Sequence, residues 1–267
     1  MKNRQKESVA MSGDRNKNMI SGCIVTYNNV SIISECIESI LNWTKGLDFT
    51  LYISDNNSTD GTVELIRKKF PEVIILENRK NIGFGEGHNR VIRKLNTKYH
   101  FVINPDIYVT QNVFSPMVDY LDQHKDVAMI TPKILNDNGT EQLLPKRNPT
   151  IRYIIISKLK PFKHYRQIYT RELEKIDKPT DVDFCTGCFF GIRTSVLKRL
   201  KGFDSRYFMY MEDADLSRMV RRRYRIVFYP EVFVYHKWSR ENTRSIKGIT
   251  RWFKSMVKYF VKWGWKF

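Results

Sequence analysis

Three carboxylates, Glu212, Asp213 and Asp215, stand within four residues, between an aromatic stretch and a run of arginines. Acidic side chains are favourable at a helix N-terminus, where the unpaired N–H groups carry partial positive charge. A capped, solvated helix start is therefore one interpretation of this cluster. A second acidic position, Asp106, follows an apolar run far upstream and favours another interpretation. Two carboxylate sites on different elements can meet at one cleft, where one holds a cation and the other takes a proton.

The elements that must position these groups alternate between strand and helix in the first part of the chain. Short apolar runs predict buried strands, and apolar residues at helical spacing predict helices. The predicted strands are 19–27, 50–54, 73–76 and 99–103, and the predicted helices are 32–41 and 62–69. This alternation is typical of a parallel sheet with right-handed crossovers. The predicted fold class is therefore α/β with a mostly parallel central sheet.

In such a sheet the ligand crevice lies outside the carboxyl ends of the strands. Polar side chains at or just after those ends are Thr26, Tyr27, Asn28, Asp55, Asn57 and Asn104. The segment 81–87 follows the third strand and carries three alternate glycines, which accept positive φ and let a backbone approach closely. A helix that begins there would aim its N–H groups at an anion. An ordinary tight turn explains the same glycines, because the pattern is not the dinucleotide fingerprint.

Asp106 and His236 are the candidate ligands for a metal ion. Asp106 lies at the tip of a buried strand, where a hard cation bridging two phosphates could be held. A turn cap is the alternative, since Asn-Pro and Asp both favour turns. His236 closes an edge strand that we predict at 232–236. A lone histidine is more often structural than a ligand, so a contact with metal or phosphate stays open at this point.

Composition limits the class of partner. The chain has 267 residues and a formal net charge of +18, which predicts an anionic partner: nucleic acid, an acidic membrane surface or a phosphorylated substrate. Cys185 and Cys188 form a C-x-x-C pair, but no second pair stands nearby, so small buried cysteines are favoured over zinc. Residues 1–18 are predicted to be a disordered leader, and no signal peptide or membrane-spanning run is visible.

Two later segments depart from the strand and helix alternation. The segment 145–178 is basic and aromatic, and we expect a loop excursion over the ligand edge that faces nucleic acid, a headgroup layer or an acceptor. The tail 237–267 predicts a basic amphipathic helix. Its apolar face holds Ile246, Ile249, Phe253, Met256, Phe260 and Trp263, and its basic face holds Lys247, Arg251, Lys254, Lys258 and Lys262. Such a helix suits an anionic membrane surface, and packing on its own domain is the alternative.

The order of these motifs resembles glycosyltransferase family 2, most closely its rhamnosyltransferase-like bacterial branch. The motifs are Val25-Thr26-Tyr27-Asn28, Asp55-Asn56-Asn57-Ser58-Thr59-Asp60-Gly61, Asn81-Ile82-Gly83-Phe84-Gly85, Asn104-Pro105-Asp106, Gly202-Phe203-Asp204 and Glu212-Asp213-Ala214-Asp215-Leu216. The resemblance covers residues 19–236 and rests on the order and spacing of the motifs, since each alone is modest. It implies the GT-A fold, a single nucleotide-binding α/β domain, and inverting transfer from a nucleoside-diphosphate sugar.

The resemblance also implies roles for individual residues. Asp213 matches the general base, and Asp106 matches a ligand of Mg²⁺ or Mn²⁺ in the D-x-D position, whose first Asp is Asn104 here. His236 matches a further metal ligand of some relatives. The implied nucleotide-sugar site comprises Thr26, Tyr27, Asn28, Asp55, Asn57, Asn81, Gly83, Phe84, Gly85, Asn104 and Glu212. Thr26 and Tyr27 would line the base pocket, and Asp55 would hydrogen-bond a pyrimidine.

The expected activity is transfer of a sugar, with dTDP-L-rhamnose favoured as donor and a UDP-sugar as the alternative, to a hydroxyl of a lipid-linked saccharide in bacterial cell-surface polysaccharide synthesis. The expected location is peripheral, on the cytoplasmic face of the bacterial inner membrane. A nucleotidyltransferase would need a basic loop after the first strand, where Asn28 and Asn29 stand. A basic nucleic-acid-binding protein is the non-enzymatic rival, although much of the charge lies in the tail and in 145–178. We therefore do not expect nucleic acid as a partner.

Overall fold

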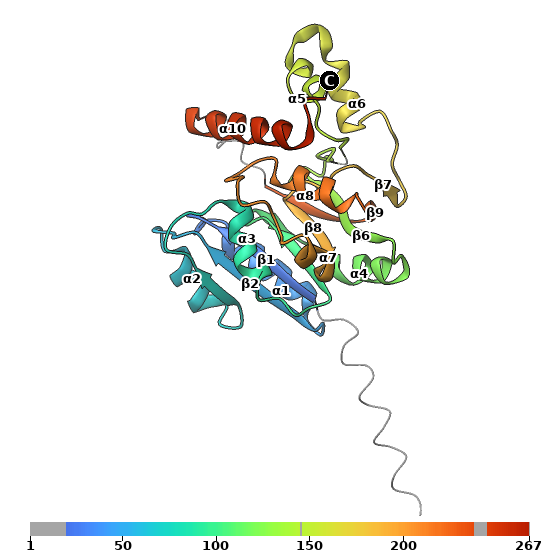
Figure 1. The fold of residues 1–267 in the computed structure, drawn as a ribbon. Helices are drawn as coiled ribbons and strands as arrows, with labels where there is room; N and C mark the ends of the chain where they lie inside the picture. The colour runs from blue at the N-terminus through green and yellow to red at the C-terminus, as the bar shows by residue number, and fades with distance from the viewer. Residues whose placement is uncertain (1–19, 145, 238–244, 267) are drawn as a thin grey trace, which may run out of the picture.

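All strands of the described residues join one sheet (Figure 1). The computed structural model describes residues 20–144, 146–237 and 245–266, so the predicted leader lies outside the described residues. The strands are β1 (Ile20–Thr26), β2 (Phe49–Asp55), β3 (Ile74–Glu77), β4 (Tyr99–Ile103), β5 (Ile107–Tyr108), β6 (Val127–Leu135), β7 (Thr180–Asp181), β8 (Phe189–Arg193) and β9 (Arg225–His236).

Helices connect and cover these strands. They are α1 (Ile33–Thr44), α2 (Thr62–Lys69), α3 (Phe84–Ile92), α4 (Phe114–Gln123), α5 (Ile151–Ile154), α6 (His164–Thr170), α7 (Thr194–Arg199), α8 (Glu212–Val220) and α10 (Ile246–Trp263). Two 3₁₀ turns, η1 (Ile156–Lys158) and η2 (Lys160–Phe162), lie between α5 and α6. Each strand and helix predicted up to residue 103 has a counterpart, with ends that differ by a few residues.

The order of strands is β3-β2-β1-β4-β8-β6-β9-β5, with β7 paired to β9 outside this path. The pairs among β1, β2, β3 and β4 are parallel, as is the pair of β6 with β9. Strand β8 runs antiparallel to both of its neighbours, and β5 and β7 run antiparallel to β9. The α/β class with a central sheet is confirmed, and the second half of the chain makes the sheet mixed. The parallel strands β1, β2 and β4 end at one edge, where ligands bind in such sheets.

Helices cover both faces of the sheet. One core cluster joins it to α1, α2 and α4, and a second joins it to α3, α7 and α8. Strand β1 is buried along its whole length and alternates between the two clusters, with Ile20 and Ile24 in the first and Cys23 and Val25 in the second. Such a strand reads as a continuous apolar run, which is the pattern that made it predictable.

The prediction of an edge strand at 232–236 is wrong. Strand β9 is one element from Arg225 to His236 and lies between β6 and β5. His236 pairs with Ile107 of β5, a strand of only two residues that no apolar run reveals. The register against β6 jumps between Tyr229 and Phe233, next to Pro230. A proline inside a sheet is tolerated at such an irregularity because it cannot donate a ladder hydrogen bond.

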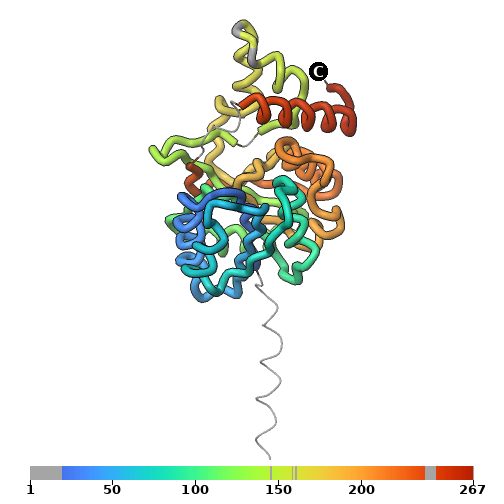
Figure 2. Tube along the Cα trace, turned by 90° about the vertical axis from the view of Figure 1, so that its left-hand side faces the viewer, coloured from blue at the N-terminus to red at the C-terminus, as the bar shows by residue number. Residues whose placement is uncertain are grey.

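Residues 146–178 and 245–266 together form a structure that we call the cap. In Figures 1 and 2 the short helices of the first segment and α10 lie beyond one edge of the sheet, away from where the chain enters β1. The two segments are joined where Ile151 N–H donates to the Lys266 carbonyl at 2.9 Å. A third apolar cluster packs Met256 and Phe260 of α10 against Tyr207 and Met211, in the loop before α8. The cap is therefore fixed to the part of the chain that leads into the acidic cluster.

Within the described ranges, no helix combines the length and the apolar character that crossing a bilayer requires.

Candidate active site

The ends of β1 and β2 form the first part of the candidate site. Thr26 and Asp55 are register partners at the last positions of the two parallel strands. The buried Asp55 carboxylate accepts hydrogen bonds from the N–H of Ser58 at 2.9 Å and from its hydroxyl at 2.5 Å. The Thr26 hydroxyl donates to the side-chain oxygen of Asn29 at 2.9 Å. Both side chains thus order the loops that follow their own strands.

The two loops also bond to each other. Asn28, whose φ is 56°, donates its N–H to the Ser58 hydroxyl and accepts from the N–H of Thr59. Tyr27 and Asn57 are left exposed on this joined surface. The Tyr27 ring and the Asn57 amide are therefore accessible to a ligand placed over the strand ends.

The glycine segment lies beside these loops. The buried Asn56 amide donates to the Gly83 carbonyl at 3.1 Å, and Gly83 N–H donates to the Asn81 side chain at 3.0 Å. Gly83 has a φ of 86°, and a Cβ there would lie 2.2 Å from the Phe208 carbonyl oxygen. The N–H of Phe84 donates to that same oxygen at 2.9 Å. The close approach that the glycines permit is thus to the loop before α8, and it brings the 81–85 segment to the acidic cluster.

Asp106 and His236 come together at the candidate metal position. The ring Nε2 of His236 lies 3.2 Å from the Asp106 Oδ1, and both side chains are largely buried. Gln142 donates its amide N–H groups to Asn136 and to the His236 carbonyl, so its Oε1 faces His236 Nδ1 at 3.0 Å. An amide oxygen only accepts, so Nδ1 carries a proton in this arrangement, and Nε2 is the ring nitrogen that faces Asp106.

A carboxylate oxygen and an imidazole nitrogen that face each other are of the types that bind divalent cations. A histidine ligand whose other nitrogen is held by a hydrogen bond is the usual arrangement around a metal. Among the described residues there is no group of three or more His, Cys, Asp or Glu side chains that could hold an ion. Two protein ligands suit a cation that is shared with substrate phosphates, as Mg²⁺ commonly is.

Glu212 and Asp213 open α8, and the residues before them are strained. Tyr210 and Met211 have φ values of 72° and 70°, in the left-handed region that non-glycine residues rarely adopt. Asp213 Oδ2 accepts from the Gly187 N–H at 2.9 Å, and its Oδ1 accepts from the Ala214 N–H at 2.8 Å. Burial raises the pKa of Asp213, and these two N–H donors oppose the shift because they favour the charged form. The carboxylate is therefore held in one orientation with its charge partly compensated.

Glu212 is in a less polar place than its neighbour. It is 5% exposed, and its Oε2 has no hydrogen-bond partner among the described residues. Burial, and then the negative charge of Asp213, raise the pKa of Glu212. Both adjacent carboxyl groups thus have raised pKa values, and Asp213 differs in accepting two backbone N–H groups that favour its charged form.

One loop, 185–188, connects Asp213 with the candidate metal position. Gly187 donates to Asp213, and a Cβ on Gly187 would lie 3.4 Å from that side chain and 3.3 Å from the Phe84 ring. The next residue, Cys188, accepts from the Asn104 N–H through its carbonyl at 2.8 Å. The structure thereby brings Asp213, Phe84 and the Asn104 to Asp106 turn to one place. All four cysteines are buried and free, so the C-x-x-C pair is part of this packing, as expected.

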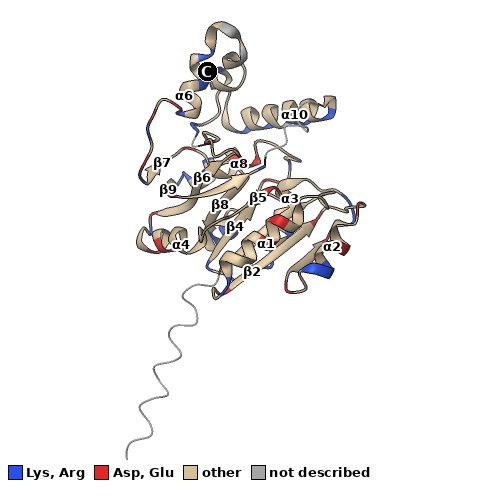
Figure 3. Ribbon diagram, turned by 180° about the vertical axis from the view of Figure 1, so that it is seen from behind, with Lys and Arg blue, Asp and Glu red and all other residues tan. Residues whose placement is uncertain are grey.

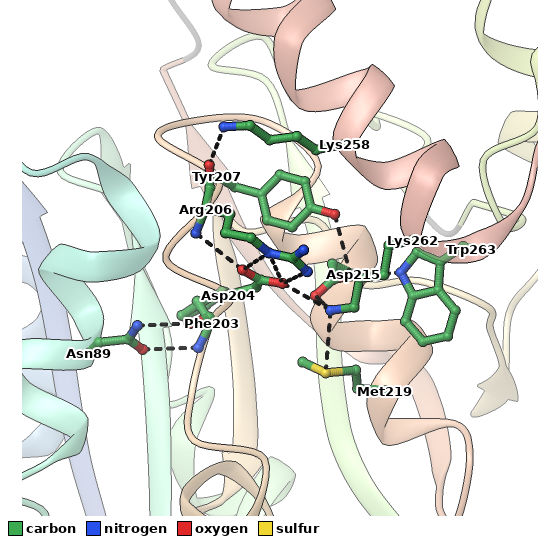
Figure 4. A network of polar contacts seen from close by, with 10 residues as sticks. All are labelled: Asn89, Phe203, Asp204, Arg206, Tyr207, Asp215, Met219, Lys258, Lys262 and Trp263. Carbon is green, nitrogen blue, oxygen red and sulfur yellow. Dashed lines mark hydrogen bonds and ion pairs between the residues drawn. The ribbon is translucent and has the colours of Figure 1, made fainter.

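Asp215, the third carboxylate of the cluster, points toward Lys262 and Trp263 of the cap (Figure 4). It is fully buried and accepts from Lys262 Nζ at 2.7 Å and from the indole N–H of Trp263 at 2.6 Å. Lys262 also donates to Asp204 at 3.0 Å, so one ammonium of α10 bridges two carboxylates of the domain. The expectation that Lys262 belongs to a basic face suited to an anionic membrane surface is therefore wrong, because a helical wheel does not show what packs beside a helix.

Sequence reasoning missed two side chains of the site. Gln142, which fixes the ring of His236, lies in a segment without any motif. Lys146 lies beside Asp213, with its ammonium 5.7 Å from the centre of the Phe184 ring and 6.0 Å from that of Tyr169. The basic and aromatic composition of 145–178 was the signal that could have indicated Lys146, but composition does not tell which of its lysines turns inward.

A family model described as glycosyl transferase family 2 matches residues 21–201 of the chain. The N-acetylglucosaminyl-diphospho-decaprenol L-rhamnosyltransferase of Mycobacterium tuberculosis is 26% identical over 204 residues, which cover 70% of this chain and 66% of that relative. The rhamnosyltransferase WbbL of Escherichia coli is 26% identical over 191 residues, covering 67% and 70% of the two chains.

A solved structure with a similar fold is the mannosyltransferase PcManGT from Pyrobaculum calidifontis in complex with GDP-Man and Mn²⁺. The TM-score is 0.62 at 14% identity, and the match covers 91% of this chain and 65% of that one. At such identity the likeness concerns the fold, and it confirms the nucleotide-sugar-binding α/β fold expected from the motif order.

Proposed function

The chain belongs to glycosyl transferase family 2, and we propose that it transfers a sugar from a nucleoside diphosphate to a hydroxyl group with inversion at the anomeric carbon. The observation that carries the proposal is the 185–188 loop, which contacts Asp213 on one side and the turn that holds Asp106 on the other. A proton acceptor and a pair of cation ligands within one site are what such a displacement requires.

In this proposal Asp213 is the general base. The acceptor oxygen forms a bond to the anomeric carbon while the bond from that carbon to the diphosphate oxygen breaks, and the electron pair leaves with the diphosphate. The hydroxyl proton goes to the Asp213 carboxylate, which the Gly187 and Ala214 N–H groups hold in position. One displacement on one face gives inversion, and it needs a single base rather than a covalent intermediate.

Asp106 and His236 would hold the divalent cation, Mg²⁺ or Mn²⁺. When bound, the ion supplies positive charge to the leaving diphosphate, which is otherwise a poor leaving group. The residues themselves orient the site: Gln142 fixes the His236 ring, and Lys237 N–H donates to the Asp106 carbonyl at 2.9 Å. We assign the nucleotide to the strand ends, with Thr26, Tyr27, Asn28, Asp55 and Asn57 near the base. The sugar and diphosphate then lie near Asn81, Gly83, Phe84, Gly85, Asn104 and Glu212.

For the donor we propose dTDP-L-rhamnose, and for the acceptor a hydroxyl of a lipid-linked saccharide used for bacterial cell-surface polysaccharide. The rhamnosyltransferase names of the two relatives, one of them acting on a diphospho-decaprenol-linked sugar, support both assignments. A UDP-sugar is the alternative donor.

The cap supports peripheral attachment to an anionic membrane, on the cytoplasmic face where nucleotide sugars are made. Of the fourteen large apolar side chains that are exposed among the described residues, ten belong to the cap. Exposed apolar side chains gathered on one part of a surface mark an interaction site. Lys and Arg residues lie along α10 beside them (Figure 3), which suits anionic headgroups.

The proposal is tested by incubating the protein and Mn²⁺ with a panel of nucleotide sugars and following release of nucleoside diphosphate. The panel contains dTDP-L-rhamnose, a dTDP-hexose, UDP-glucose, UDP-N-acetylglucosamine and GDP-mannose. We expect dTDP-L-rhamnose to give the highest rate and the largest rise in melting temperature. A UDP-sugar giving both would replace the donor assignment, and no response to any member would contradict the transferase proposal.

A further inference from the structure

The general base proposed above, Asp213, must be ionised to take a proton, yet it is a carboxyl group inside the protein. Burial raises its pKa, and Glu212 beside it adds a second acidic group. Two backbone N–H groups oppose the shift, but partial charges offset only part of the cost of burying a full charge. A cationic side chain near Asp213 would favour its charged form further, and the sequence motifs contain none.

The titratable groups that face Asp213 come from four elements. They are Glu212 of α8, Cys185 and Cys188 of the 185–188 loop, Lys146 and Tyr169 of the cap segment, and Tyr259 of α10. Burial raises the pKa of both thiols and of both phenols, so these four groups are neutral near pH 7. Lys146 is the one group of this set of described residues that can carry a positive charge; burial lowers its pKa, and the negative charge of Asp213 opposes that shift.

The backbone fixes where Lys146 lies. Lys146 and Phe184 form an antiparallel bridge, just before the 185–188 loop that bonds Asp213. Its neighbours are held as well, because Arg147 N–H donates to the Tyr169 carbonyl at 2.9 Å and Asn148 N–H donates to Asp183 at 3.1 Å. The side chain is thus presented from a short stretch tied at several points, rather than from a loose loop.

The ammonium of Lys146 is held by aromatic rings and not by a carboxylate. Its Nζ lies 5.7 Å from the centre of the Phe184 ring and 6.0 Å from that of Tyr169, distances typical of cation–π contacts. It makes no hydrogen bond or ion pair with the other described side chains. Because aromatic rings do not neutralise the ammonium, its positive charge can still act on Asp213 and on groups that enter the site.

We propose that Lys146 is a positioning residue for the reaction, and that its ammonium keeps Asp213 ionised so that it can accept the proton of the acceptor hydroxyl. This inference rests on the proposed function of Asp213 as the base. The segment 145–178 then has a role in the chemistry, because it contains Lys146, whose ammonium acts on the Asp213 carboxylate of α8. A cap segment shifted away from the sheet would raise the pKa of Asp213 further and lower the fraction of the base that is ionised.

The direct test is the titration of Asp213 itself, followed by carbon-13 NMR of protein labelled at the aspartate side-chain carboxyl. The Asp213 signal is identified by its loss in Asp213→Asn. In Lys146→Met the midpoint should move to higher pH by on the order of one unit, the size of shift that a lost neighbouring charge produces. Lys146→Arg should restore most of the shift, and Tyr169→Phe, which keeps the ring beneath the ammonium, should leave the midpoint unchanged.

An Asp213 midpoint in Lys146→Met equal to that of the wild-type protein would overturn the inference. Lys146→Gln provides a polar replacement if the Met variant does not fold, as judged by its melting transition, and it should show the same shift. The acid limb of the kcat/KM profile should move in the same direction as the NMR midpoint. The NMR titration needs no substrate. A protein that is inactive with every donor would therefore refute the proposed function, while the titration would still decide whether Lys146 lowers the pKa of Asp213.

Discussion

At the scale of single residues, the distinction that matters is between three carboxylates that are close in sequence. Asp213 is bonded to two backbone N–H groups, Glu212 has one oxygen without a partner among the described residues, and Asp215 is paired with Lys262 and Trp263. Their shared position at the start of a helix would alone predict the same role for all three carboxylates. Their different partners support the proposed role of the first as the base, a proton-binding role for the second and a structural role for the third.

Asp213→Asn removes the proposed base with almost no change in size. We expect turnover to fall by at least about 10²–10⁴-fold, the contribution typical of a positioned base. Donor binding should change little, because the amide keeps a side-chain oxygen for the Gly187 N–H. The rate of nucleoside diphosphate release and a donor titration check the two halves of this prediction. Turnover like that of the wild-type protein would remove Asp213 from the role.

Glu212→Gln tests the second carboxyl through stability. The pKa of Glu212 is raised in the folded protein from an ordinary value of 4.5, so the folded state holds a proton that the unfolded chain releases. That contribution to stability is complete below the ordinary value and is lost as the pH rises through the raised pKa. The gain in melting temperature of Glu212→Gln over wild type should therefore be larger at about pH 8 than at about pH 5. An equal difference at both values would show that Glu212 does not titrate in this way.

At the scale of elements, α10 is attached to α8 through a small polar network (Figure 4). Lys262 bonds Asp204 and Asp215, and Lys258 one turn earlier donates to the Arg206 carbonyl. Asp204 also forms a two-point ion pair with Arg206, and the Arg206 and Lys262 partners hold the pKa of Asp204 well below its usual range. Since α8 begins at Glu212, the docking of the last helix supports the helix that carries the base.

Lys262→Met should therefore destabilise the protein strongly. It leaves the fully buried Asp215 without its cation, and removing one partner of a buried ion pair costs roughly 3–5 kcal/mol. Lys258→Met is the matched control on the same helix, and it should cost far less because Lys258 is exposed and bonds a neutral carbonyl. Urea unfolding measures both. Equal losses for the two variants would contradict the anchoring role of Lys262.

The same helix has two further stripes on its outer side. At 100° per residue, Ile246, Ile249, Phe253 and Val261 form one exposed apolar stripe, and Lys247, Arg251, Lys254 and Lys258 form a basic one beside it. Met256 and Phe260, assigned with the first group from the sequence, are buried against the domain instead. The tail thus packs on its own domain with one side and keeps an apolar and a basic stripe for another partner.

At the scale of the whole molecule, the cap gathers the exposed apolar side chains on one part of the surface. Phe253 and Ile249 are each 55% exposed, and Ile246 is 83% exposed. Together with the net charge of +18, this arrangement fits an anionic lipid surface better than a nucleic acid, because the phosphates of a nucleic acid do not bind apolar side chains.

The double variant Ile249→Ser, Phe253→Ser should bind vesicles of anionic phospholipid at least about tenfold more weakly than the wild-type protein, because it removes two apolar side chains from the contact. Ile74→Ser, which changes an exposed apolar residue of β3 outside the cap, is the control and should bind normally. Vesicle sedimentation measures both, and neutral vesicles and a single-stranded oligonucleotide at physiological salt should bind little. If the double variant bound the vesicles as well as the wild-type protein does, or if the protein bound the oligonucleotide tightly, the proposed membrane-binding role of the cap would be refuted.

The parts of the fold that could be predicted are those whose pattern is local. The strands β1, β2 and β4 are apolar runs, and Thr26, Asp55 and Asn104 stand at or after their ends. Strand β5, the partner of His236, has two residues and depends on a neighbour far along the chain, so no local pattern reveals it. Gln142 and Lys146 were missed for the same reason: their positions are set by pairing with distant segments.

The central claim is that Asp106, with His236, and Asp213 serve one site for a nucleoside diphosphate and a divalent cation. Calorimetric titration of the donor with and without Mn²⁺ tests it most directly. For the wild-type protein and Asp213→Asn, Mn²⁺ should tighten donor binding to a similar extent, whereas Asp106→Ala should lose that tightening and keep the weaker, cation-independent binding. Donor binding that does not respond to Mn²⁺ in the wild-type protein, or that responds equally in Asp106→Ala, would contradict the account.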